Sequence, residues 1–497
     1  MLYRMLLKQA RKYPRKLAVI GERRALTYQN LLGETEKAAL TFRSWSLGPG
    51  DHLLLGLPPC PEFFVIFYAG AALGVAVVPV SPSGNLPEKV LSLERLAAAG
   101  EKTFLGKLRR SGLKIDHEIS WSPALGLSLL RSSQTKPARF TRSRTTRAEP
   151  ILGSFTSGST GEPALLFRTV EVLFKRAKLG AAAWGVRPAD ILLSTGPFTS
   201  GVNAVYNLVA PVLVGCSVVV LEKFERRRAV EAIARHRVTR IFAVPLIFDI
   251  LARLPRSYRP DFSSVKNLSS VGAHLPRSIY DAFYKKFGLR IGQGYGGTDF
   301  ALAFTVNRRG LPDSVGHRDG IFPVRILDER GKPARAGAIG EIAFDILKVK
   351  DRSVRAALVA NSKRRGRYLF TGDLGRFDRA GNLYVVGRKS SMIKVGANRV
   401  IPAEVENVLR THPRVREALV VPIRPGRTDE AVGALVVRNG RLTAAELLRH
   451  CAERLDGYKC PREIVFRKHL ARGSHGKVIR YLYKTVGHKG HRSPRVD

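Results

Sequence analysis

The sequence predicts an α/β protein with a large N-terminal domain of layered βαβ sheets and a small α+β domain at the C-terminal end. Apolar runs of β character alternate with amphipathic helical stretches, for example Ser217–Leu221, Arg228–Arg237 and Arg240–Val244. This rhythm is typical of parallel sheets covered by helices. A chain of 497 residues is also too long for one ordinary core, which favours two or more domains.

A long apolar segment, Pro61–Val80 (PEFFVIFYAGAALGVAVVPV), has enough residues to span a bilayer. However, Glu62 lies near its start, and Gly74 separates a helix-like half from a half rich in valine. A buried helix followed by a buried parallel strand fits this pattern better, so no transmembrane segment is expected. Just before it, Gly48–Asp51 (GPGD) predicts a turn between a helix and a strand at Leu53–Leu57.

The boundary between the domains is placed where the pattern changes. Ile401–Arg410 predicts a helix with Pro402 in its first turn, and the chain beyond it has its own strand and helix runs. We therefore predict a large domain at 1–387, a hinge at 388–391 and a small domain at 392–497. Residues 131–150 are rich in Arg, Ser, Thr and Pro, which predicts a surface linker.

Composition indicates a globular chain that attracts anions. Hydrophobic residues make up 44% and the formal net charge is +44, which favours nucleotides, coenzyme A, an acidic carrier protein, a membrane surface or nucleic acid as partners. Nucleic acid is disfavoured, since neither zinc-finger spacing nor an aromatic-interleaved basic stripe is present. The apolar run in the first residues is too short for the hydrophobic region of a signal peptide. The cysteines are scattered without CxxC spacing, which predicts neither zinc nor disulfides. Together these observations predict a cytoplasmic protein. The cysteines are Cys60, Cys216, Cys451 and Cys460.

The stretch Phe155–Leu166 (FTSGSTGEPALL) is a loop of hydroxyls and glycines that suits a triphosphate. Gly153–Gly158 satisfies GxxxxG, but Ser159 follows where a Walker loop needs lysine, which excludes a P-loop NTPase. A plain turn is the alternative interpretation. The residues concerned are Thr156, Ser157, Gly158, Ser159, Thr160 and Gly161.

Four later segments carry further candidate groups. Gly292–Gly297 (GQGYGG) matches a dinucleotide motif only weakly, but Tyr295–Asp299 (YGGTD) could stack a base, bond a phosphate and hold Mg²⁺; the alternative is a β-turn with a buried tyrosine. In Thr371–Leu374 (TGDL), the aspartate can accept hydrogen bonds from a ribose diol, and the arginine of Gly387–Gly396 can reach the same sugar or its phosphate. Leu470–Val478 (LARGSHGKV) places one lysine after a glycine-punctuated loop.

In this order and spacing, these segments resemble the adenylate-forming superfamily of acyl- and aryl-CoA synthetases, firefly-type luciferases and peptide-synthetase adenylation domains. The resemblance runs from Leu26–Leu31 (LTYQNL) and Gly50-Asp51 to Gly476-Lys477, nearly the whole chain. It implies that a carboxylate and MgATP form an acyl-adenylate with release of pyrophosphate. The acyl group then passes to a thiol, usually of coenzyme A or another phosphopantetheine, after the mobile small domain has rotated.

The resemblance also implies roles for individual residues. The hydroxyl loop would cradle the β- and γ-phosphates, Gly272-Ala273 and Tyr295 would enclose the adenine, and Asp373 with Arg388 would hold the ribose. Asp299 stands where the family usually has a Mg²⁺-binding glutamate. The nucleotide-binding residues implied are Thr156, Ser157, Gly158, Ser159, Thr160, Gly161, Gly272, Ala273, Gly294, Tyr295, Gly296, Thr298, Asp373 and Arg388.

Two lysines are implied to be catalytic. Lys477 would stand between the carboxylate and the α-phosphate, where an ammonium stabilises two anions as they converge. Ser390 occupies the hinge position. After rotation, Lys394 would enter the site, and Gly396 would leave room for the pantetheine arm.

The acyl pocket is implied to lie at Phe198, Ser200 and Val202, and Ser200 stands where many acyl-CoA ligases carry a histidine gate. No acidic residue lies between Asp190 and Glu222 to pair with an ammonium, so an α-amino acid is disfavoured. An aliphatic or aromatic carboxylic acid is expected.

The sequence departs from the family in three places. Ala164-Leu165 replaces Lys-Gly after the loop proline, Asp299 replaces glutamate, and the usual Gly-Tyr segment between Glu341 and Thr371 is not recognisable. Three readings stay open: a ligase for coenzyme A, a ligase for an acyl carrier protein, and a non-catalytic nucleotide-binding homologue.

Overall fold

The computed structural model places both domains. It describes residues 1–82, 90, 92–122, 126–132, 148–155, 165–255, 257–258, 260–297, 302–320, 322–349, 355, 363–423, 430–471, 478 and 483. The predicted phosphate loop at 156–164, Thr298, Asp299 and Lys477 lie outside these residues.

A seven-stranded sheet with the order β7-β6-β5-β3-β4-β8-β9 is built from the first part of the chain. Its central strands are parallel, and the hairpins β6–β7 and β8–β9 are antiparallel. Helix α5 (Lys102–Arg110) packs on its outer face, where Phe104 joins side chains of the central strands. The strands are β3 (His52–Gly56), β4 (Ala76–Pro79), β5 (Leu96–Gly100), β6 (Ile115–Ser122), β7 (Gly126–Ser132), β8 (Pro150–Phe155) and β9 (Leu165–Thr169).

A second, eight-stranded sheet has the order β15-β14-β13-β12-β10-β11-β1-β2. Its six inner strands are parallel, and only the edge strands β2 and β15 are antiparallel. Helices α9 (Arg226–Arg235), α10 (Pro245–Ala252) and α11 (Arg277–Phe287) cover one face. The strands are β1 (Leu17–Ile20), β2 (Ala25–Thr27), β10 (Ile191–Ser194), β11 (Ser217–Val220), β12 (Arg240–Ala243), β13 (Asn267–Ser270), β14 (Ile291–Gly297) and β15 (Leu302–Asn307).

A layer of helices lies between the two sheets, because the largest buried cluster combines side chains of both sheets with those of these helices. Including α5 and α9–α11, the large domain therefore stacks five layers, which confirms the predicted α/β class. The elements of the middle layer are α1 (Leu2–Lys12), α2 (Tyr28–Ser44), α3 (Pro61–Leu73), α6 (Val170–Trp184), the short α7 (Gly201–Asn203), the π-helix η1 (Ala204–Val209) and α8 (Ala210–Val214).

The apolar segment Pro61–Val80 forms the predicted buried helix and strand. Every residue of α3 is buried, and β4 follows it as a parallel partner of β3. The carboxylate of Glu62, in the first turn of α3, pairs with Arg24 at 2.8 Å, which is how a charge is accommodated at this depth. Within the described ranges, no helix is long and apolar enough to cross a membrane.

The linker predicted at 131–150 is wrong at both ends. Arg131 and Ser132 complete β7, and Pro150 already belongs to β8. β7 pairs with β6 and β8 pairs with β9, so hydrogen bonding to a neighbouring strand overrides the polar composition of these ends. Residues 133–147 lie outside the described residues.

A third sheet, of five strands, completes the large domain. Its core contains Val324, Ile342 and Leu369, and Tyr295 of β14 belongs to the same cluster. This packing joins the third sheet to the edge of the eight-stranded one. The elements are β16 (Val324–Leu327), β17 (Gly340–Asp345), the 3₁₀ turn η3 (Ile346–Lys348), β18 (Lys363–Arg365), β19 (Tyr368–Phe377) and β20 (Leu383–Arg388).

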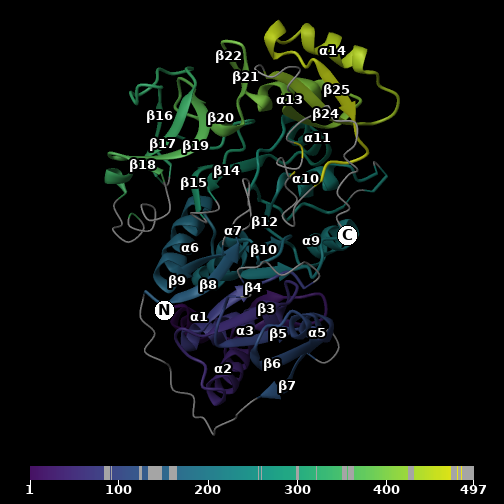
Figure 1. Ribbon diagram of the computed structural model, residues 1–497. Coiled ribbons are helices and arrows are strands. Elements are labelled where there is room, and N and C mark those ends of the chain that lie inside the picture. The colour runs from purple at the N-terminus through teal and green to yellow at the C-terminus, as the bar shows by residue number, and fades with distance from the viewer. Residues whose placement is uncertain are drawn as a thin grey trace.

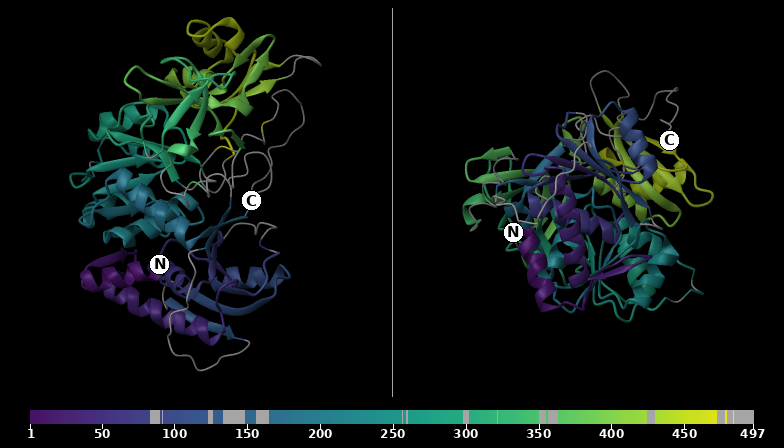
Figure 2. Two further views of the ribbon diagram at one scale, coloured as in Figure 1. Left: turned by 90° about the vertical axis from the view of Figure 1, so that its left-hand side faces the viewer. Right: turned by 90° about the horizontal axis from the view of Figure 1, so that it is seen from below.

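The small domain follows β20 through the single 3₁₀ turn η4 (Lys389–Ser391). Its two clusters of buried residues consist only of residues from Ile393 onward, so it has a core of its own. Figures 1 and 2 show it at one end of the molecule, with the seven-stranded sheet at the other end. Its elements are β21 (Ile393–Val395), β22 (Asn398–Val400), the predicted helix α13 (Pro402–Thr411), β23 (Val415–Ile423), β24 (Ala431–Arg438), α14 (Ala444–Ala452), η5 (Gly457–Lys459) and β25 (Glu463–Phe466).

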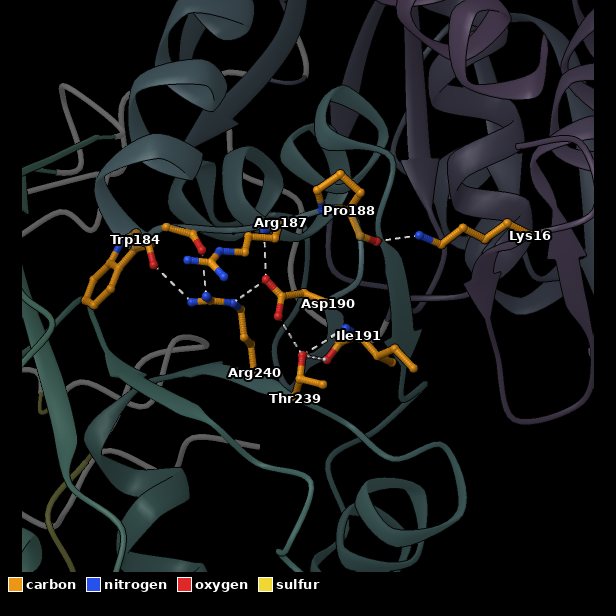
Figure 3. Close-up of polar contacts among 9 residues, drawn as sticks. Lys16, Trp184, Arg187, Pro188, Asp190, Ile191, Thr239 and Arg240 are labelled. Atoms are coloured by element: carbon orange, nitrogen blue, oxygen red, sulfur yellow. Dashed lines mark hydrogen bonds and ion pairs between the residues drawn. The ribbon is translucent and has the colours of Figure 1, made fainter. Parts of the chain in front are cut away.

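A buried ion pair holds the amino ends of β10 and β12 together (Figure 3). The Arg240 guanidinium lies 2.6 Å from a carboxylate oxygen of Asp190, and both side chains are at most 10% exposed. Arg240 also donates to the main-chain carbonyls of Trp184 and Gly185, where α6 ends. The other oxygen of Asp190 accepts from Thr239 at 3.0 Å. The network thus ties two strands and a helix end on the side of the sheet away from the strands' carboxyl ends.

Candidate active site

The turn after β13 lies at the edge where parallel strands end, which is where open α/β sheets bind ligands. Gly272 and Ala273 follow this strand and are exposed. Gly272 has a φ of +84°, a left-handed conformation that favours glycine, so the backbone turns sharply here. The structure thus presents a bare main-chain turn at the position predicted to lie against adenine.

Tyr295, Asp373 and Arg388 meet on three strands. The phenol of Tyr295 on β14 donates to a carboxylate oxygen of Asp373 on β19 at 2.7 Å. Asp373 and Arg388 are register partners across β19 and β20, and an Arg388 Nη1 atom lies 3.3 Å from the other carboxylate oxygen. Tyr295 and Arg388, predicted to touch base and ribose, therefore both contact Asp373. The Tyr295–Asp373 pair is separated by 78 positions in the chain.

Local backbone geometry fixes this carboxylate. Gly372 has a φ of +76°, which bends β19 just before Asp373. The Asp373 N–H donates to the hydroxyl of Thr371 at 3.1 Å, and that hydroxyl donates to the Ile342 carbonyl at 2.9 Å. Thr371, which the sequence analysis did not name as a site residue, thus anchors the predicted ribose ligand. Its place in the TGD motif, directly before Gly372 and Asp373, could have identified Thr371 from the sequence.

Tyr295 is held in its protonated form. Burial is the main cause that raises the pKa of its phenol well above 10, and the neighbouring Asp373 charge raises it further. The phenol therefore remains a donor to Asp373 over the physiological pH range. Gly294 and Gly296 flank it within β14, which pairs with the antiparallel β15. The segment is therefore a strand with a buried tyrosine, not a dinucleotide-binding turn.

The predicted acyl segment lies beside the middle helical layer. Phe198 is buried, with its ring 4.8 Å from that of Phe63 and 5.6 Å from that of Phe64 on α3. Ser200 precedes α7, and Val202 is half-buried against the core. Asn203 Nδ2 donates to the carbonyl of Pro197 at 3.0 Å, which holds the start of this segment. The sequence analysis missed Asn203, since a polar residue in an apolar run gives no signal of its own.

The residues predicted in the small domain are not assembled with this site. Lys394 is exposed on β21, and its main-chain N–H donates to Glu430 at 2.9 Å. Gly396, with a φ of +58°, forms the tip of the β21–β22 hairpin, and Ser390 is exposed in η4. In the described part of the chain, no hydrogen bond or ion pair joins the Lys394 side chain to Tyr295, Asp373 or Arg388.

One residue of the small domain lies near the turn at Gly272-Ala273. His274, next to Ala273, is exposed, but the protein atoms around its ring and the positive charge of Arg410 on α13 lower its pKa. Two ion pairs also connect the domain and its hinge to the third sheet. The Arg399–Glu329 and Lys389–Glu341 pairs both have N–O distances of 2.6 Å.

The predicted metal ligand Asp299 and the phosphate loop lie outside the described residues. Among the residues that the structure does describe, no group of three or more His, Cys, Asp or Glu side chains could hold a metal ion. The described residues of the site are thus those predicted to contact the base and the ribose.

Two family models match this chain. Residues 6–345 match the family model of the AMP-binding enzyme, and residues 404–477 match that of the AMP-binding enzyme C-terminal domain. The crotonobetaine/carnitine–CoA ligase of Escherichia coli (strain SE11) is 27% identical over 478 residues, which cover 91% of this chain and 92% of that protein.

Solved structures of similar fold cover nearly the whole chain. An O-succinylbenzoate coenzyme A synthetase (MenE) from Bacillus subtilis, in complex with ATP and magnesium ion, has a TM-score of 0.80 at 25% identity, covering 97% of this chain and 99% of its own. ATP-bound MatB from Rhodopseudomonas palustris has a TM-score of 0.83 at 21% identity, covering 97% and 98%.

These matches confirm the predicted superfamily and its enzyme class, the AMP-forming acid–thiol ligases. The first family model alone spans more than half of the chain. The protein is therefore a member of the AMP-binding enzyme family.

Proposed function

We propose that this enzyme activates an aliphatic or aromatic carboxylic acid with MgATP and transfers the acyl group to the thiol of coenzyme A. The observation that carries the proposal is the contact between Tyr295, Asp373 and Arg388. A carboxylate held by a buried phenol and an arginine suits a ribose diol, since it is fixed in place and accepts hydrogen bonds. The names of the relatives support the acceptor, because they are coenzyme A ligases.

In the first half-reaction, a carboxylate oxygen attacks the α-phosphorus of ATP, and the bond to the β-phosphate breaks to release pyrophosphate. Both reactants are anions, so a positioned ammonium lowers the barrier by stabilising the charge that they share as they approach. We assign this role to Lys477. Mg²⁺, held with the help of Asp299, would neutralise phosphate charge when bound.

In the second half-reaction, the thiol attacks the acyl carbon and AMP leaves. We propose that the small domain rotates about Ser390 between the two steps and brings Lys394 and Gly396 to the site. The contacts to be broken are weak: Arg399 and Glu329 are both exposed, and surface ion pairs contribute about 0–1 kcal/mol. The single turn η4 is the covalent connection, so the rotation costs little.

Ser390→Pro tests this rotation. Proline fixes φ at the pivot and restrains the residue before it, so we expect thioester formation to fall more than adenylate formation. Single-turnover assays of each half-reaction measure this split. Ser390→Ala is the control, because it removes the hydroxyl without fixing φ, and it should behave as wild type. An equal loss in both half-reactions of Ser390→Pro would show that Ser390 is structural.

Asp373→Asn tests the ribose site. We expect MgATP binding to weaken about 10-fold, because hydrogen bonds to a charged acceptor contribute about 1.5–3 kcal/mol. ATP lacking the 2′- and 3′-hydroxyls should bind the wild type more weakly than ATP, and this difference should shrink in Asp373→Asn, as measured by calorimetry. Asp378→Asn, in the turn after β19, serves as the control. An unchanged preference for the diol in Asp373→Asn would remove Asp373 from the ribose site.

Acceptor and acid are tested together. A panel of acids is screened for ATP-dependent pyrophosphate release, with coenzyme A or with a phosphopantetheinylated carrier protein. We expect thioester formation with coenzyme A. A product only on the carrier would favour the second reading, a carrier-protein ligase, which the chain's positive charge also suits. If no acid of the panel causes pyrophosphate release, a non-catalytic homologue would be favoured.

A further inference from the structure

Two arginines are buried between the large sheets, close to the stem of the predicted phosphate loop. Arg168 on β9 and Arg176 on α6 are 5% and 4% exposed. Arg168 donates to the hydroxyl of Ser154 on β8, two residues before the loop begins. The stem itself is formed by the pairing of β8 and β9, whose last described pair is Phe155 with Leu165.

Arg176 has no acidic partner among the residues that the structure describes. Its Nη1 atom is buried without a hydrogen-bond partner, and within the described ranges no carboxylate forms an ion pair with it. Burial and the nearby Arg168 charge lower the pKa of Arg176 to about 9, so the group still carries its charge at neutral pH. An uncompensated buried cation is costly, and a bound anion would relieve that cost.

The position of Arg176 indicates which anion it would bind. Leu179 lies three residues further on the same face of α6 and packs against the cluster that contains Tyr295. In the other direction, Arg176 lies near Arg168 at the loop stem. This face of α6 therefore lies between the stem of the predicted phosphate loop, at Arg168, and the cluster that contains Tyr295. An anion between these two places would be the phosphate group of a nucleotide.

We propose that Arg176, together with Arg168, binds the phosphate oxygens of ATP and pyrophosphate and supplies the positive charge that Ala164 does not. The proposal rests on the proposed function, because it requires a nucleotide in the site. Guanidinium groups match phosphate geometry well, since their N–H donors bind two oxygens at once. The two guanidinium groups would thus let the loop bind phosphates without its usual lysine.

Arg176→Met removes the charge and keeps much of the side-chain volume. We expect MgATP to bind about 10- to 100-fold more weakly and the KM for pyrophosphate in exchange to rise similarly, with AMP affinity nearly unchanged. The melting temperature without ligand should not fall, because a buried unpaired charge is removed. Arg176→Lys should lose less affinity than Arg176→Met. Lys178→Met, an exposed cation on the same helix, is the control and should behave as wild type.

The possible outcomes separate the claims. Wild type that binds no ATP would contradict both the proposed function and this inference. Wild type that binds ATP, with Arg176→Met and Arg176→Lys binding it equally well, would contradict the inference alone. A variant in which only the KM for the acid rises would assign Arg176 to a second carboxylate of the substrate instead. A lower melting temperature with unchanged ATP affinity would make Arg176 a structural residue.

Discussion

Lys477→Ala is expected to slow acyl-adenylate formation about 10²–10³-fold while leaving the second half-reaction largely intact. The expected loss is that of one positioned group that stabilises charge developing in the transition state. We propose that Lys477 acts while the carboxylate and the α-phosphate approach each other, and their repulsion no longer exists once the adenylate has formed. Rapid quench of adenylate formation, compared with thioester formation from supplied acyl-adenylate, measures the two steps separately.

The control for Lys477 is a second lysine with the opposite expected pattern. Lys394→Ala should reduce thioester formation more than adenylation, because we place Lys394 at the site only after the domain rotates. Lys477→Ala that forms adenylate at the wild-type rate would contradict its assignment. If both variants lose the same half-reaction, the two lysines do not alternate.

Arg240→Met is expected to destabilise the large domain by about 3–5 kcal/mol, which is the typical cost of removing one partner from a buried ion pair. The Asp190 carboxylate would then remain buried among Arg187, Thr239 and the end of α6, with two hydrogen bonds but no opposite charge (Figure 3). A lower midpoint of denaturant unfolding, followed by fluorescence, measures the effect. Enzyme that is still folded at low temperature should keep its KM for ATP, because the pair lies at the amino ends of the strands.

Two further variants make this prediction specific. Arg253→Met removes an exposed pair with Asp249 on α10 and should change stability by less than about 1 kcal/mol. The double variant Asp190→Asn with Arg240→Met should recover part of the loss, since no unpaired charge remains. Equal effects of Arg240→Met and Arg253→Met would show that the buried network contributes little.

The layered fold could be predicted because its signals are local. The apolar run of α3 and β4 and the βαβ rhythm around α9 follow from periodicity alone. The ends of the linker at β7 and β8 could not, because hydrogen bonding to a neighbouring strand, and not the polar composition of these residues, decides them. Motif order indicated Tyr295, Asp373 and Arg388 separately, but only the structure shows that the phenol donates to the carboxylate.

The buried arginines were missed for a physical reason. In a chain with 84 lysines and arginines, each arginine is expected at the surface, where such residues usually lie. Arg240 and Arg176 are buried, one with an acidic partner 50 positions away and the other without one. Neither a distant partner nor a missing one can be seen in the residues that neighbour an arginine in the sequence.

Isotope transfer from the acid to the nucleotide tests the central claim most directly. An acid that passes the panel is labelled with ¹⁸O in its carboxylate and incubated with the enzyme, MgATP and coenzyme A, and the products are analysed by mass spectrometry. If the carboxylate attacks the α-phosphorus, one ¹⁸O remains on AMP after the thiol displaces it, and pyrophosphate is unlabelled. Label in inorganic phosphate together with ADP, or thioester formation with unlabelled AMP, would contradict activation through an acyl-adenylate.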